Sequence, residues 1–128
     1  MQTLLLIAAV ITFVTGLIHS VMGEILIFRH VRNGGLVPAL GAPPLRESNI
    51  RIIWATWHLA TLFGWAFAGV MFQLALGNPL SSSLIISAVF FAYLGGAILV
   101  LIGTKGRHPG WIALSAVAAL IWLATNAA

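Results

Sequence analysis

The side chains that could do chemistry in this chain are few: His19, Glu24, His58 and His108. There is no Cys and no Asp, and only two Glu are present. Disulfides, thiolate metal sites and hydrolysis by paired carboxylates are therefore excluded. Neutral imidazole is the commonest metal ligand, and it also titrates near neutral pH. The available chemistry is thus ligand binding by His or the handling of protons.

The segments that carry these residues are too apolar for a water-soluble fold. The composition is 61% hydrophobic and 6% charged, and the mean hydropathy is +1.09. A helix needs roughly 20 apolar residues to cross a bilayer, and continuous apolar runs favour helices over alternating barrel strands. Four runs predict helices at residues 4–28, 50–76, 83–104 and 109–125. We expect one all-α integral membrane domain, residues 1–128, folded as an up-down bundle of four transmembrane helices.

The basic residues predict the orientation of these helices. All six lie at two of the three connections: Arg29, Arg32, Arg46, Arg51, Lys105 and Arg107. By the positive-inside rule the connections at 29–49 and 105–108 are cytoplasmic, so both termini lie outside. We expect a protein of the bacterial inner membrane. The same residues form no basic stripe with interleaved aromatic side chains, so nucleic acid is not an expected partner.

His19 and His58 are predicted to lie at a similar depth. At 1.5 Å per residue, His19 is about 15 Å from Arg29, and His58 is about 10 Å from Arg51. Ionisable groups within membrane spans usually face the bundle interior, where they are candidates for function. The two imidazoles are therefore expected to face each other across neighbouring helices.

Helical spacing supports this orientation for both His residues. His19 shares a stripe with small or polar side chains: Thr12, Thr15, Gly16 and Gly23. His58 shares a stripe with Arg51, Trp54, Thr61, Trp65 and Gly69. Glu24 lies about 140° around the helix from His19. A compact triad of His19, Glu24 and His58 is therefore not expected.

The first hypothesis is that His19 and His58 hold a metal ion or a haem iron, with Trp54 and Trp65 flanking a flat apolar pocket open to the cytoplasm. Four residues are candidates for supporting positions around these ligands: Glu24, Thr15, Thr61 and His108. No residue is assigned a catalytic role. The signal is incomplete, because no metal-binding spacing motif and no third ligand accompany the two His.

Two other hypotheses remain open. In one, the His residues only donate hydrogen bonds between helices, and the protein is an accessory subunit or homo-oligomer of a membrane complex. In the other, they conduct protons or a small solute past the hydroxyls of Thr12, Thr61, Tyr93 and Ser115. The outer half of the runs is nearly all apolar, which argues against a continuous wet path.

The remaining features have simpler interpretations. We expect Glu24 to pair at the surface with Arg51, Arg107 or His108. Arg29, His30 and Arg32 are expected to face lipid headgroups. Ala88, Ala92 and Gly96 stand four residues apart; we expect this spacing to serve close helix packing within the chain, with a dimer face as the alternative.

Overall fold

The computed structural model describes residues 1–127 and is all-helical. Its elements are α1 (Gln2–Leu26), the short 3-10 helix η1 (Phe28–Val31), α2 (Glu47–Ala75), α3 (Ser82–Thr104) and α4 (Gly110–Asn126). The four predicted helices are confirmed, with ends shifted by a few residues. α1, α2 and α3 are long and apolar enough to cross a membrane, whereas α4 is an apolar helix of 17 residues.

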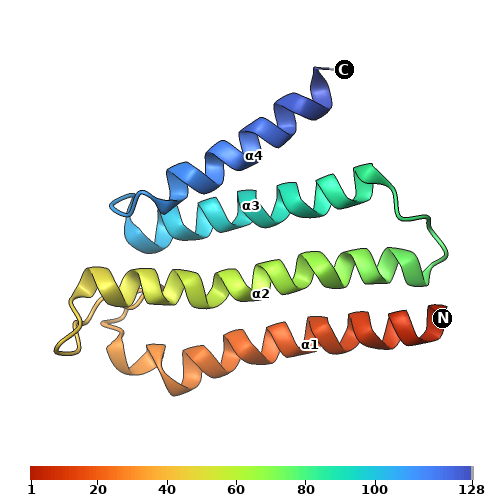
Figure 1. Cartoon of the computed structure of the whole chain (residues 1–128). Helices are drawn as coiled ribbons and strands as arrows, with labels where there is room; N and C mark the ends of the chain where they lie inside the picture. The colour runs from red at the N-terminus through yellow and green to blue at the C-terminus, as the bar shows by residue number, and fades with distance from the viewer. Residues whose placement is uncertain (128) are drawn as a thin grey trace.

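The helices lie side by side in sequence order rather than around a common centre (Figure 1). α1 packs on α2, α2 on α3 and α3 on α4. Within residues 1–127, α1 and α4 do not pack against each other. The connections at 27–46 and 105–109 lie at the same end of this row, which we call the basic end, and the N-terminus lies at the other (Figure 1). Side chains are therefore buried between neighbouring helices in the row.

Small residues allow α2 and α3 to approach closely. A Cβ atom added to Gly96 would lie 2.6 Å from Leu59, and one added to Gly103 would lie 3.1 Å from the Cβ of Ala55. Ala92 is also buried. The small-residue spacing of α3 thus serves packing within the chain, as its sequence indicated.

The connection between α1 and α2 folds back onto the helices at the basic end. The carbonyl of Val31 accepts hydrogen bonds from the N–H groups of Ala39, at 3.0 Å, and Leu40, at 2.9 Å. Phe28 and Pro38 are fully buried. Phe28, Trp54 and Val100 belong to the hydrophobic cluster at this end. The connection is therefore part of the packed structure that surrounds the candidate site.

Candidate functional site

Glycines on α1 let indole rings from α2 reach the α1 backbone. A Cβ atom on Gly23 would lie 2.7 Å from Cε2 of Trp57, and one on Gly16 would lie 2.8 Å from Nε1 of Trp65. The space is used for hydrogen bonds: Nε1 of Trp57 donates to the carbonyl of His19 at 3.0 Å. Trp65 makes an equivalent bond to α1 nearer the N-terminus, also at 3.0 Å. These contacts set the register of the two helices that carry the His residues.

His19 is held against Trp57. The two rings stack with centroids 4.3 Å apart and an interplanar angle of 7°. Nε2 of His19 lies 3.3 Å from the backbone carbonyl oxygen of Trp57. A carbonyl can only accept, so this contact requires the proton of His19 to be on Nε2.

His58 has both ring nitrogens engaged by side chains of α1. Nδ1 lies 2.8 Å from Oγ of Ser20, and Nε2 lies 3.0 Å from Oε1 of Glu24. The His58 side chain is only 16% exposed. The rings of Phe28 and Trp54 pack against it, with centroids 6.0 and 4.9 Å away. His58 is therefore positioned by polar contacts on both sides and enclosed by aromatic rings.

Glu24 is the centre of a cluster that the sequence did not predict. Its Oε1 accepts a hydrogen bond from Nε1 of Trp54 at 2.5 Å, in addition to its contact with His58. Its Oε2 pairs with the guanidinium group of Arg32. Arg32 also donates to carbonyl groups of Gly35 and Leu36 and so joins the connection to α1.

Two expectations about this cluster were wrong. Glu24 does not pair with Arg51, Arg107 or His108, because the connection folds back and brings Arg32 to it. Arg32 for the same reason is not a free headgroup-facing residue. Arg51 instead binds Glu47 at 2.7 Å and donates to the carbonyl of Gly103 at 3.0 Å, so it ties α2 to α3.

The contacts continue from His58 toward the middle of the helices. Oγ of Ser20 lies 2.8 Å from Oγ1 of Thr61, and Thr61 donates to the carbonyl of Gly16 at 3.1 Å. We call the connected side chains the polar chain: Arg32, Glu24, His58, Ser20 and Thr61. It extends from the basic end into the apolar part of the α1–α2 interface.

The polar chain ends at a groove between α1 and α2. The groove has a volume of about 310 Å³ and is lined by three hydroxyls, one imidazole and small or apolar residues: Thr12, Thr15, Thr61, His19, Ile11, Gly16, Ala60 and Gly64. Thr15 and His19 therefore share a surface with the last member of the chain.

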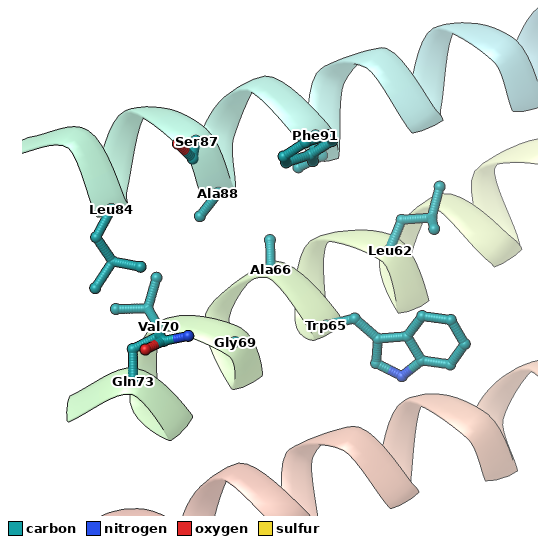
Figure 2. A pocket seen from close by; sticks show the side chains of 11 residues that line it. Leu62, Trp65, Ala66, Gly69, Val70, Gln73, Leu84, Ser87, Ala88 and Phe91 are labelled. Atoms are coloured by element: carbon teal, nitrogen blue, oxygen red, sulfur yellow. The ribbon is translucent and has the colours of Figure 1, made fainter. Parts of the chain in front are cut away.

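A second cavity lies between α2 and α3 and has a different character. It has a volume of about 390 Å³ and is lined mainly by apolar residues, with Gln73 and Ser87 among the polar ones (Figure 2). Trp65 also lines it, but its Nε1 bonds to α1. No His or charged residue lines this cavity. The cluster of Glu24 and His58 is therefore separate from this cavity.

The sequence-based site residues thus separate into groups. One group contains four of them: His58, Glu24, Trp54 and Thr61. His19 lies beside this group, against Trp57. Trp65 lies farther from the basic end. His108 lies at the start of α4, where its Nδ1 accepts from the N–H of Gly110 at 3.1 Å. Within residues 1–127 no three His or Glu side chains are grouped so that they could hold a metal ion.

Ser20 and Arg32 are the members of the polar chain that sequence reasoning missed. Ser20 lies four residues before Glu24, so the two share a helix face. That face, and not the His19 face, is the one that meets His58. Arg32 has no comparable signal, because it lies beyond the end of α1 in a connection with irregular backbone.

Comparison of the chain with protein-family models, curated proteins and solved structures gave no match.

Proposed function

We propose that this is an integral protein of the bacterial inner membrane that takes up a proton at His58 from the cytoplasmic side. The basic end would face the cytoplasm, with the helices crossing in an up-down arrangement and both termini outside. The proposal draws on the bias of basic residues toward two connections. It depends above all on one observation: His58 has a carboxylate on one nitrogen and a hydroxyl on the other.

The polar chain accommodates both charge states of His58. When His58 is neutral with its proton on Nε2, it donates to Glu24 and accepts from Ser20, while Thr61 donates to Ser20. When His58 is protonated, Nδ1–H donates to Ser20, Ser20 donates to Thr61, and Thr61 donates to the carbonyl of Gly16. Two hydroxyl groups reverse direction, and no heavy atom has to move.

Proton uptake by His58 changes the charge of its surroundings by one unit. Arg32 and Glu24 balance each other, so the cluster is neutral when His58 is neutral and carries one positive charge when His58 is protonated. Ionisable groups at such positions are costly and typically mark proton pathways. The polar chain stops at Thr61 and the groove, so we propose one-sided proton uptake rather than conduction across the bilayer.

Binding of a metal or haem at His19 and His58 has less support. Both nitrogens of His58 already have partners, and Nε2 of His19 faces a carbonyl group. A ligand bond would require one of these hydrogen bonds to break. The positive charge of Arg32 beside Glu24 would also oppose a metal cation.

The test is proton uptake by the protein in liposomes after a small pH step, followed with a pH-sensitive dye. We expect the unmodified protein to take up protons when the pH is lowered, and His58→Gln to take up one proton fewer per chain. Glu24→Gln should alter the uptake, because it removes the charge that faces His58. Trp65→Phe is the control, since it removes a hydrogen bond between α2 and α1 outside the polar chain and changes no titratable group.

The same preparations separate the alternatives. Nitrogen NMR of labelled His distinguishes a ring with one N–H from a ring with two. We expect His58 to change from the ring with one N–H to the ring with two when the pH is lowered. A single unchanging state would overturn the proposal and leave a structural role. A visible absorption band or stoichiometric metal that is lost in His58→Gln would overturn it in favour of ligand binding.

A second candidate function is that of an accessory or self-associating subunit. The groove between α1 and α2 carries Ala60 and Gly64, small residues that allow a further helix to approach closely. Ala60 and Gly64 are four residues apart, and a Cβ atom on Gly64 would meet no atom within 4 Å. Ala60→Leu would block this surface. Loss of a defined oligomer in that variant, with proton uptake unchanged, would support this function.

A further inference from the structure

The basic end contains a cavity that the polar chain does not use. It has a volume of about 320 Å³ and is bordered by the start of α2, the end of α3 and the connection to α4. Its lining is mainly charged or polar: Arg46, Glu47, Ser48, Arg51, Thr104, Lys105, Arg107 and His108. We call it the basic cavity. Its size is at the lower end of small-molecule sites, roughly 300–1,000 Å³.

The basic cavity has an excess of positive charge. Arg51 and Glu47 are paired with each other, so they cancel. The cationic groups of Arg46, Lys105 and Arg107 form no ion pair within the described residues 1–127. Three positive charges therefore border one cavity without an acidic partner.

The backbone around the cavity adds donors to these charges. α2 begins at Glu47, so its first N–H groups lie at the edge of the cavity and carry a partial positive charge. On the other side, Lys105 (φ 54°) and Gly106 (φ 72°) have left-handed conformations that end α3. With this turn, three residues that are close together in sequence all line the same cavity: Lys105, Arg107 and His108.

The other basic residues of the same end are engaged or lie elsewhere. Arg32 is paired with Glu24, and Arg29 donates to its neighbour His30. Neither residue lines the basic cavity. The cluster expected from sequence to face headgroups is thus not the one that forms a concave site.

We propose that the basic cavity binds a phosphate group, supplied by an anionic phospholipid headgroup or by a soluble phosphate. Arg46, Lys105 and Arg107 would contribute the charge, and Ser48 and the first N–H groups of α2 would donate hydrogen bonds. Arg and Lys side chains match phosphate oxygens by charge and by directed N–H donors. The position at the end of the apolar helices fits a group at the membrane surface, where basic pockets between helices bind lipid headgroups.

The test is native mass spectrometry of the full chain released from micelles that contain known lipids. The probes are dioleoylphosphatidylglycerol, dioleoylphosphatidylcholine and inorganic phosphate. Lys105→Asn and Arg107→Gln each remove one cavity charge, and Asn tolerates the left-handed conformation at residue 105. Arg29→Gln is the matched control, since it removes one charge from the same end outside the cavity.

Each cavity charge should contribute about five-fold to binding of the anionic lipid. We therefore expect about five-fold weaker binding in each single variant, about 25-fold in the double variant, and little change in Arg29→Gln. Binding of phosphatidylglycerol alone identifies a lipid source. Binding of inorganic phosphate with the same variant dependence identifies a soluble source.

Three results would overturn the proposal. The first is that the anionic and zwitterionic lipids bind equally and phosphate does not bind. The second is that Arg29→Gln and Lys105→Asn weaken binding of the anionic lipid equally. The third is that the double variant binds this lipid as the unmodified protein does. Circular dichroism of each variant checks that the helices are retained. Because none of these variants touches the polar chain, the outcome is independent of proton uptake at His58.

Discussion

The contact between Gly23 and Trp57 gives the sharpest test of the α1–α2 interface. In Gly23→Ala the new Cβ atom would lie 2.7 Å from Cε2 and 2.8 Å from Cδ1 of the Trp57 ring, and still closer to Nε1. Carbon atoms in good contact are about 3.5–4.0 Å apart. The ring or the helix must therefore move by about 1 Å.

The cost of this movement follows from the contacts that it disturbs. Overpacking of a tight interface costs about 1–3 kcal/mol. Displacement of the ring also weakens the hydrogen bond from Trp57 to the His19 carbonyl, worth about 0.5–1.5 kcal/mol. Ala gains about 0.5–1 kcal/mol over Gly in a helix. We expect Gly23→Ala to lower the free energy of unfolding by about 2 kcal/mol.

The assay is unfolding of the purified protein in mixed micelles of increasing SDS content, followed by circular dichroism. Gly69→Ala is the control, because a Cβ atom at Gly69 would meet no atom within 4 Å. The control should stay within about 0.5 kcal/mol of the unmodified protein. If Gly23→Ala unfolds together with Gly69→Ala, the indole of Trp57 does not occupy the space that Gly23 leaves, and the register of α1 on α2 is different.

Three further outcomes follow from the same contacts. Phe28→Ala should cost about 3 kcal/mol in the SDS titration, because Phe28 is 1% exposed, whereas Phe67→Ala should change little, because Phe67 is 67% exposed. Thr61→Val keeps the shape but removes the hydroxyl that is hydrogen-bonded to Ser20. We expect a loss of about 1 kcal/mol in the free energy of unfolding and a changed His58 nitrogen spectrum. An unchanged spectrum would mean that the two hydroxyls do not respond to His58. Trp65→Phe keeps an aromatic ring but removes a donor to α1, so it should lower stability by about 1 kcal/mol without changing proton uptake.

The length and the apolar content of the runs were enough to predict the helices. A bilayer requires long stretches without charge, and helices satisfy their own backbone groups, so little besides composition is needed. The helix face of His58 was also predictable, because its stripe with Trp54, Thr61 and Trp65 depends only on residue spacing. These four side chains do contact α1 or groups on it. Arg51, which shares the predicted stripe, instead donates to the carbonyl of Gly103 on α3.

The partners of these side chains depended on features that spacing does not specify. Glu24 was correctly placed away from His19, yet the helix rotation that turns Ser20 and Glu24 toward His58 depends on how Gly16 and Gly23 receive the indoles of α2. Residue types indicated small residues on α1, but not which ring would fill each space.

Local composition and the fixed rise per residue were thus enough to predict the helices, their length and apolar character, and the end that carries the positive charge. Three features appear only in the folded chain: the row of helices, the ion pair of Arg32 with Glu24, and the cavity bordered by three other cations. These features could not be predicted because an irregular connection can fold in many directions. Its direction is decided by burial of Phe28 and Pro38 and by ion pairing, which join residues far apart in the chain.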